Sequence, residues 1–418
     1  MVSSSFPSPT SGSSTRAYHI LKSLAHEHKV SLLLSLLVDD IAKESSHDVS
    51  SLEEFVQSIQ IISQLAIKHG RRKQLTSLLQ GKSYTLNRYI LPEVQEALDN
   101  LLADHQYDIV LFEGILVADY RIPKDVQIII DLYDIQHELV QRSRQRKKNW
   151  VSRWYCSLEH WLIKPAELKL CKAATHILVC SERERFYLQG LLPESTITVV
   201  PNGVDIENFH GQQKQEVRNR IIFTGAMNYF PNVDAVLFFA YKCWPLILSK
   251  VPDATWQIVG RDPTTEVLKL ARLPHVTVTG SVPDMQPYLA ASTVAIAPIL
   301  AGSGTRLKIL EALAMKKAVV STTIGCEGLS VEPGKHLMVA DEAEAFARAV
   351  IAFLYNPELR AAYGDAGRSL VESMYRWEYC GQQLLQALKD MSSDKTFIQT
   401  NFLSTSTEEE TKGISIPV

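Results

Sequence analysis

The most informative segment of this chain is GSGTRLKILEALA, at residues 302–314. It follows an apolar run at 294–298 that predicts a buried strand, and its own apolar residues recur at helical spacing. A strand that passes through a glycine-rich loop into a helix is typical of α/β folds, and glycines let backbone N–H groups approach a ligand closely. We expect Ser303 or Thr305 to cap the helix. The segment therefore predicts a strand–loop–helix unit with a ligand at the loop.

The start of this helix also predicts an anion site. A helix N-terminus presents unpaired N–H groups and the positive end of the helix dipole. Arg306 and Lys308 add two cations where an ordinary helix favours acidic residues, so an anion between them and the helix accounts for both. Glu311 lies further along, where a carboxylate accepts hydrogen bonds from a ribose in other nucleotide sites. The alternatives are a plain helix cap with two solvated charges and, for Glu311, a surface position.

Apolar runs of strand length alternate with helical segments along most of the chain, which predicts parallel sheets flanked by helices. The expected strands are at 29–37, 108–112, 127–131, 176–180, 197–200, 220–225, 255–260, 276–279, 294–298, 318–322 and 337–339. The series restarts after a Pro-Asn-Gly turn at 201–203, so we expect α/β domains at residues 1–205 and 206–375. A disordered tail is expected at 391–418.

The beginning of the chain is unusual for such a fold. A doubly wound domain opens with a buried strand, but only five residues precede the loop at 6–16. We therefore expect either a truncated first strand or a natural start upstream of Met1.

Composition excludes several classes of protein. The net charge of −3 over 418 residues gives no reason to expect nucleic acid as the partner. The six cysteines form no CxxC pair, which argues against a zinc site or a disulfide framework. No apolar stretch approaches the ~20 residues that a bilayer requires, and the N-terminus lacks the features of a signal peptide. These observations predict a cytoplasmic protein.

Several segments, taken in order, resemble the retaining glycosyltransferases of family 4. They are PSPTSG at 7–12, VVPNGVD at 199–205, TGAMNY at 224–229, IVG at 258–260, VTG at 278–280, and the 304–314 segment followed by VVST at 319–322. The resemblance covers residues 6–388. It implies the GT-B architecture, in which two Rossmann-like domains face a central cleft, and a crossover helix at 376–390 that returns to the first domain.

The resemblance also implies a nucleotide-diphosphate sugar held by the C-terminal domain and a glycan or lipid-linked acceptor held by the N-terminal domain. No cofactor is expected beyond this donor substrate. The donor contacts expected from the resemblance and from the 302–314 segment are Gly12, Gly225, Arg261, Ser303, Gly304, Thr305, Arg306, Lys308 and Glu311. Gly12 would approach the donor from across the cleft.

This chain departs from the family pattern at two places. Many members carry a Glu-x7-Glu pair whose first Glu holds the donor sugar, and that position is Ser303 here. Many also carry a basic pair after the strand at 220–225, where this chain has AMNY at 226–229. Arg306 and Lys308 are the cations available to replace that charge.

The expected chemistry is stabilisation of a departing diphosphate by N–H donors and cations. Asp131 and Asp134 do not form the short Asp-x-Asp motif of metal-dependent transferases, so we expect no metal. Asp134, His137 and Arg306 are the expected catalytic residues, His137 because family members have a functional histidine in this region. Asp131 and Glu113, at strand ends, are expected on the acceptor side. In the alternative reading Asp131 caps a turn and His137 is a surface residue.

A basic and aromatic stretch runs from Arg142 to Trp161. Residues 142–153 contain six basic side chains and no acidic one, and Trp150, Trp154 and Trp161 follow closely. Such a mixture suits the surface of an anionic membrane, which predicts peripheral contact at the inner face of the membrane. A solvated basic helix is the alternative.

Two other functions share the expected fold. A sugar-nucleotide epimerase needs acid/base groups on both sides of the sugar, and Ser303 supplies none. The missing Glu also suits a non-catalytic subunit that binds a nucleotide sugar.

Overall fold

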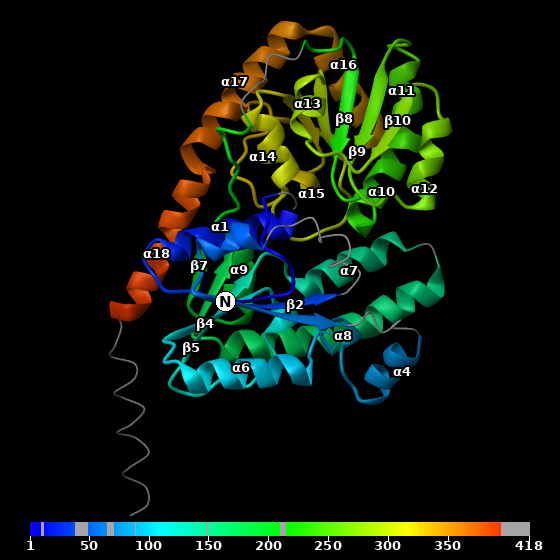
Figure 1. Ribbon diagram of the computed structural model, residues 1–418. Helices are drawn as coiled ribbons and strands as arrows, with labels where there is room; N and C mark the ends of the chain where they lie inside the picture. Colours follow the sequence, from blue (N-terminus) through cyan, green and yellow to red (C-terminus); the bar gives the residue numbers. More distant parts are fainter. Residues whose placement is uncertain are drawn as a thin grey trace, which may run out of the picture.

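A computed structural model describes residues 1–9, 12–37, 49–64, 71–87, 89–147, 149–209 and 215–393. It contains two domains, each with a parallel sheet flanked by helices, and the C-terminal domain is uppermost in Figure 1. The two Rossmann-like domains predicted from the sequence are therefore present, in the GT-B arrangement.

The N-terminal sheet has seven strands in the order β3-β2-β1-β4-β5-β6-β7. Its strands are β1 (Val2–Ser3), β2 (Ser31–Leu37), β3 (Ser58–Gln64), β4 (Ile109–Glu113), β5 (Gln127–Leu132), β6 (His176–Val179) and β7 (Ile197–Val199). β1 has only two residues and lies between β2 and β4, as in the alternative of a truncated first strand. The sequence did not predict β3, which is an edge strand with many polar residues.

The C-terminal sheet has six strands in the order β10-β9-β8-β11-β12-β13. They are β8 (Arg220–Thr224), β9 (Thr255–Val259), β10 (Val276–Gly280), β11 (Val294–Ala297), β12 (Ala318–Ser321) and β13 (Met338–Val339). The strand order reverses between β8 and β11 in this sheet and between β1 and β4 in the other. Ligands of open α/β sheets bind beyond the carboxyl ends of the strands at such points.

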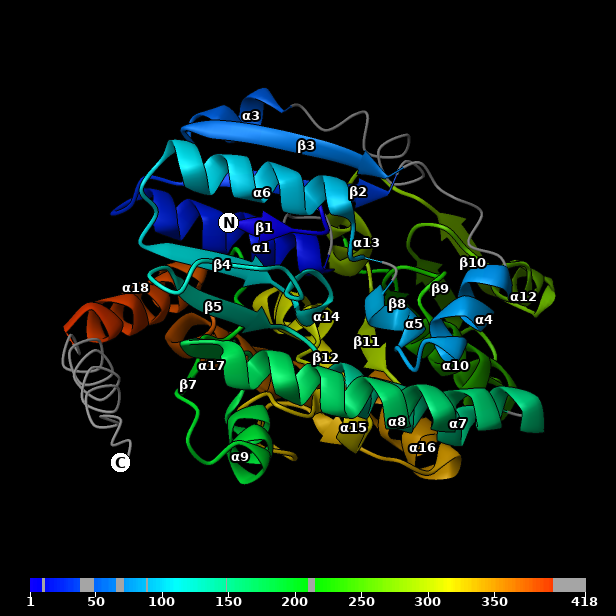
Figure 2. The ribbon, with the colours of Figure 1, turned by 90° about the horizontal axis from the view of Figure 1, so that it is seen from below.

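Helices cover the faces of both sheets. Figure 2 shows α6 (Pro92–Asp104) and α8 (Trp150–Ala173) on the side of the N-terminal domain that faces away from the C-terminal domain. In the C-terminal domain, α14 (Leu307–Ala314) follows β11 and buries Ile309, Leu310 and Leu313 completely. Burial of such side chains contributes about 1.5–3 kcal/mol each, so α14 is firmly held and its polar positions are fixed.

The chain crosses between the domains twice, at neighbouring places. The N–H of Val204, after β7, donates to the carbonyl of Tyr375 at 2.7 Å, and Trp377 packs against Gly203. Helix α17 (Pro357–Met374) belongs to the C-terminal domain, and α18 (Trp377–Ser393) packs on α1 (Gly12–Ala25) of the N-terminal domain.

The expected tail lies almost wholly outside the described residues, since α18 continues to Ser393 and residues 394–418 are not described. Within the described ranges, no helix has both the length and the apolar character needed to cross a membrane.

Candidate active site

The loop at residues 302–306 connects β11 to α14 and reaches the other domain. Arg306 is the N-cap residue of α14 and no side chain caps the helix, so the prediction that Ser303 or Thr305 caps it is wrong. Both hydroxyls instead accept hydrogen bonds from the N-terminal domain. The N–H of Ile135 donates to Ser303 Oγ at 2.9 Å, and Asn202 Nδ2 donates to Thr305 Oγ1 at 2.8 Å.

Glycine is required in this loop because the two domains approach closely there. Gly304 has a φ of +70°, and a Cβ at this position would collide with the carbonyl oxygen of Tyr133 and lie 2.7 Å from Asp134 Oδ1. The predicted glycine loop therefore faces the segment that follows β5, where the acceptor-side residues were expected.

Arg306 keeps part of its guanidinium group unpaired. Its Nη1 donates to the carbonyl oxygens of Ser303 and Gly304, the latter at 2.5 Å, while Nη2 is buried and has no hydrogen-bond partner among the residues that the structure describes. An unsatisfied buried donor costs about 1–3 kcal/mol, and more when it is charged. An anion or hydroxyl bound at Nη2 would remove this cost.

Lys308 lies at the carboxyl end of β8. Its Nζ donates to Asn232 Oδ1 at 2.7 Å and lies 3.9 Å from the centre of the Phe223 ring. Gly225 has a φ of +144°, and a Cβ there would lie 2.8 Å from Lys308 Nζ. Burial and, to a smaller extent, the charge of Arg306 lower the pKa of Lys308 to about 7, while the charge of Glu311 opposes the shift. Lys308, Gly225 and Asn232 thus meet where a basic pair was expected from the family and is missing.

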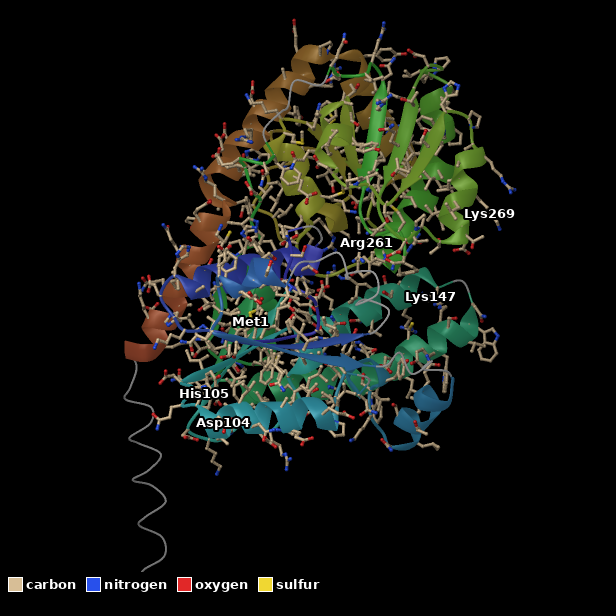
Figure 3. The ribbon with its side chains drawn as sticks, viewed as in Figure 1. Met1, Asp104, His105, Lys147, Arg261 and Lys269 are labelled. Carbon is tan, nitrogen blue, oxygen red and sulfur yellow. The ribbon has the colours of Figure 1, made fainter. Side chains whose placement is uncertain are left out.

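Glu311 and Arg261 are two further residues of the C-terminal domain that were expected to contact the donor. Burial raises the pKa of Glu311 to about 7 against the opposing charge of Lys308. Arg261 follows β9 and its side chain is exposed. Its Nη1 lies 3.7 Å from Oδ2 of Asp262. Figure 3 shows Arg261 at the edge of the C-terminal domain that faces the N-terminal domain. From the N-terminal domain, Gly12 opens α1.

Both carboxylate oxygens of Asp131 are engaged in a buried ion pair. Its two oxygens accept from Arg16 Nη2 at 2.6 Å and Nε at 2.8 Å, and both side chains are nearly inaccessible to water. Arg16 Nη1 also donates to the carbonyl of Val200 and to Asn202 Oδ1. Asp131 therefore ties α1, β5 and the interdomain linker together, and neither the acceptor-side expectation nor the turn-cap alternative fits its contacts.

His137 is fully buried near the start of α7 (Gln136–Arg146). Its Nδ1 lies 2.6 Å from Glu167 Oε2 and its Nε2 lies 2.9 Å from the Tyr187 hydroxyl. Glu167 also accepts from the backbone N–H groups of Gln136 and His137, so it caps α7 from α8. The surface alternative for His137 is wrong. With both ring nitrogens engaged and no exposed area, the ring is suited to positioning α7 and not to contact with a substrate.

The other two carboxylates keep unpaired oxygens. Glu113 Oε2 accepts from Ser3 Oγ at 2.6 Å and Ser5 Oγ at 3.3 Å, but its buried Oε1 has no partner in the described part of the chain. Burial raises the pKa of Glu113 to about 8, against the hydrogen bond from Ser3. Asp134 is partly exposed, and burial also raises its pKa to about 8, against the charge of Arg306. Glu113 lies at the β1/β4 crevice, as expected for an acceptor-side residue by its position alone.

A cluster of charged side chains joins the two domains and was not predicted from the sequence. Arg142 Nη1 donates to the carbonyl of Gly302 at 2.8 Å, and its guanidinium also pairs with Glu138 at 2.7 Å and with Glu327. Arg183 pairs with Glu138 and lies 3.6 Å from Glu327. We call Glu138, Arg142, Arg183 and Glu327 the interdomain charge cluster. No sequence signal marks it, since its members come from three distant segments.

Several cations of the basic stretch that begins at Arg142 contact the C-terminal domain. Besides Arg142, Arg146 pairs with Asp234 at 2.7 Å and Lys147 lies 3.7 Å from the centre of the Phe230 ring, both in the C-terminal domain. Figure 3 shows Lys147 near the junction of the domains. These cations are therefore not the free basic surface that the sequence predicted. The tryptophans remain exposed: Trp150, Trp154 and Trp161 are 77%, 60% and 72% accessible.

Comparison with known proteins identifies the family. Residues 10–208 match the model of Glycosyltransferase Family 4, and residues 218–356 match that of Glycosyl transferases group 1. The two matches occupy the two domains in turn. The chain belongs to this glycosyltransferase family, as its sequence motifs predicted.

The relatives differ in how much of the chain they cover. A GDP-mannose-dependent monoacylated alpha-(1-6)-phosphatidylinositol monomannoside mannosyltransferase from Corynebacterium glutamicum is 27% identical over 46% of this chain and 56% of its own length. The chain spans about half the length of the curated relatives it matches, between 43% and 62%.

Solved structures resemble nearly the whole chain in fold. Sucrose-phosphate synthase from Thermosynechococcus elongatus has a TM-score of 0.69 at 15% identity, with 94% of this chain and 99% of that chain covered. Anabaena HepE in complex with UDP-glucose has a TM-score of 0.64 at 13% identity, with 93% and 98% covered. At these identities the likeness concerns the fold alone.

Proposed function

We propose that this protein transfers a sugar from a nucleotide-diphosphate donor to a glycan or lipid-linked acceptor. The observation that carries the proposal is the buried, unpaired Nη2 of Arg306 at the start of α14, beside the β8/β11 crevice. A diphosphate there would meet Arg306, Lys308 and the N-terminus of the helix. Glu311 is then available to accept hydrogen bonds from the ribose.

In this proposal the protein works by stabilising the leaving group. Cleavage of a sugar–phosphate bond places negative charge on the departing diphosphate, and groups already oriented towards it lower the barrier. Arg306 and Lys308 supply the cations that other family members place after the strand equivalent to β8. Transfer with retention of configuration is what the family implies.

Reaction products distinguish this function from its two alternatives. Purified protein is incubated with labelled UDP-, GDP- and ADP-sugars, with and without lipid-linked or glycan acceptors. We expect sugar transfer, or slow donor hydrolysis when no acceptor is present. Isomerised donor would indicate an epimerase, and tight binding without turnover would indicate a non-catalytic subunit. Either result would overturn the proposal.

Independence from metal is a separate part of the proposal. Among the residues that the structure describes, no group of three or more His, Cys, Asp or Glu side chains is arranged to hold an ion. We expect the same turnover in excess chelator as in its absence. Loss of turnover with chelator, restored by Mg²⁺ or Mn²⁺, would contradict this part alone.

We also propose peripheral contact with an anionic membrane through the face of α8 that carries Trp150, Trp154 and Trp161. These residues are spaced by four and seven positions, so they lie on one side of the helix. Tryptophan rings favour the membrane interface, and a lipid-linked acceptor would be reached there.

Liposome binding tests this surface directly. We expect wild-type protein to pellet with vesicles of phosphatidylglycerol and phosphatidylcholine, less so at high salt, and the triple variant W150S/W154S/W161S to remain in the supernatant. Replacement of the exposed Tyr355, in the C-terminal domain, by Ser is the matched control and should pellet as wild type does. Equal pelleting of wild type and the triple variant would exclude this face. The cytoplasmic location predicted from the sequence stays a prediction.

A further inference from the structure

Two polar groups without hydrogen-bond partners among the described residues lie where the domains meet. Among the described residues, the carboxylate of Asp134 forms no hydrogen bond or ion pair, and Nη2 of Arg306 is buried without a partner. Asp134 follows β5 of the N-terminal domain, whereas Arg306 precedes α14 of the C-terminal domain. The two are close enough for the charge of Arg306 to oppose the raised pKa of Asp134, yet they form no direct ion pair.

The carboxylate lies against the 302–306 loop. A methyl group added to Gly304 would come within 2.7 Å of Asp134 Oδ1, so the N-terminal domain places an acidic group directly beside the loop. The loop contributes no carboxylate of its own, because residue 303 is a serine. The Oγ atom of Ser303 already accepts the N–H of Ile135, and the side chain is only 4% exposed.

We propose that Asp134 binds the hydroxyl groups of the sugar that is transferred, from the opposite domain to the one that binds the nucleotide. This inference rests on the proposed function and assigns the sugar-binding carboxylate within that same site. A sugar hydroxyl both donates and accepts hydrogen bonds. With the diphosphate bound at Arg306 Nη2, the attached sugar would lie beside Asp134 and would satisfy the free oxygens of its carboxyl group.

The proposal predicts different effects of Asp134 on two ligands. A nucleoside diphosphate without sugar gains nothing from Asp134, whose carboxyl group bears little negative charge at neutral pH because burial raises its pKa to about 8. A nucleotide sugar gains hydrogen bonds between its hydroxyl groups and this carboxyl group. Removal of Asp134 should therefore weaken binding of the nucleotide sugar selectively.

Calorimetric titration of wild-type protein and Asp134→Ala provides the test, with two ligand pairs: GDP with GDP-mannose, and UDP with UDP-glucose. For the pair that wild type binds, we expect Asp134→Ala to weaken the nucleotide sugar by about tenfold. The nucleoside diphosphate should bind equally well. Asp134→Asn keeps the side-chain volume and should show a smaller loss. Asp104→Asn, on the far side of the N-terminal domain in Figure 3, makes the same substitution at a distant carboxyl group and should behave as wild type.

Each outcome has a distinct meaning. If both Asp134 variants keep wild-type affinity for the nucleotide sugar, or lose affinity equally for the sugar-free nucleotide, the sugar-binding role is overturned while the proposed function stands. If wild type binds none of the four ligands and turns over no nucleotide sugar, the proposed function itself fails.

Discussion

The segment that begins at the end of β5 and the segment after β11 both carry charged residues to the junction of the domains, but they use them differently. Asp131 in β5 and His137 in α7 have every polar side-chain atom engaged by neighbouring side chains, and Asp134 between them has no hydrogen-bond partner among the described residues. After β11, Arg306 retains an unpaired nitrogen. A charged residue at a strand end is therefore a functional candidate only when part of its hydrogen-bonding capacity remains unused.

The largest effect is expected from breaking the buried ion pair of Asp131, whose two oxygens are both engaged. Asp131→Ala should reduce the free energy of unfolding by about 3–5 kcal/mol, because it leaves Arg16 buried without its counter-ion. Denaturant unfolding measures this. The double variant R16M/D131L, which removes both charges, should recover most of the loss. A single variant with wild-type stability would mean that Asp131 is not a structural residue and would return it to the list of substrate contacts.

Replacement of Arg306, which keeps an unpaired nitrogen, should change the turnover rate and not the free energy of unfolding. Arg306→Ala should lower turnover by about 10²–10³-fold, the loss typical of removing one donor to a developing negative charge. Its unfolding transition should stay near that of wild type, because within the described ranges Arg306 bonds only to carbonyl groups of its own loop.

Arg261→Ala is the matched control for that variant, since this exposed arginine lies on the same rim and should contribute less. Wild-type turnover and donor affinity in Arg306→Ala would show that the helix start is not the diphosphate site.

Donor binding should also depend on pH, through two titrating side chains of α14. Burial lowers the pKa of Lys308 and raises that of Glu311, both to about 7. As pH rises through 7, Lys308 loses its positive charge and Glu311 gains a negative one, so both changes oppose a bound diphosphate. Nucleotide-sugar affinity should be nearly constant below pH 6 and fall above pH 7.

The expected fall is roughly threefold per pH unit, less than the tenfold of one fully coupled proton because both side chains reach solvent. A nucleotide sugar suits the titration, since its phosphates do not titrate near neutral pH. Lys308→Arg keeps the charge at all these pH values and should flatten the profile. An unchanged profile in that variant would assign the pH dependence to another group.

The sequence predicted what depends on local pattern and not what depends on distant partners. The glycines and helical spacing at 302–314 predicted the βα unit, because the φ of Gly304 favours glycine and a Cβ at Gly304 or Gly225 would collide with its neighbours. The same segment did not reveal that Ser303 and Thr305 bind the other domain, since Ile135 and Asn202 are more than 100 residues away. The burial of His137 depends on Glu167 and Tyr187, which no spacing in the sequence associates with it.

The smallest expected effect concerns the closure of the two domains. A donor bound by one domain and an acceptor bound by the other can react only when the cleft is shut and water is excluded. The interdomain charge cluster favours the shut arrangement, because Arg142 bonds to Gly302 and Glu327 across the junction. The guanidinium is 18% exposed, so these bonds contribute roughly 1 kcal/mol, enough to change the ratio of closed to open molecules about fivefold.

We propose that the linker at 201–205 and the neighbouring segment before α18 are the hinge, since Gly203 packs under Trp377 where the chain crosses. Small-angle scattering should therefore give Arg142→Ala a larger radius of gyration than wild type when no ligand is present. A saturating nucleoside diphosphate should compact both proteins, and the variant more, because ligand binding to the closed form shifts the population towards it. Arg153→Ala removes the same charge from the exposed face of α8 and should match wild type throughout. If Arg142→Ala and wild type share one radius that no nucleotide changes, the domains are locked by contacts other than the charge cluster, and the crossing at Gly203 is not a hinge.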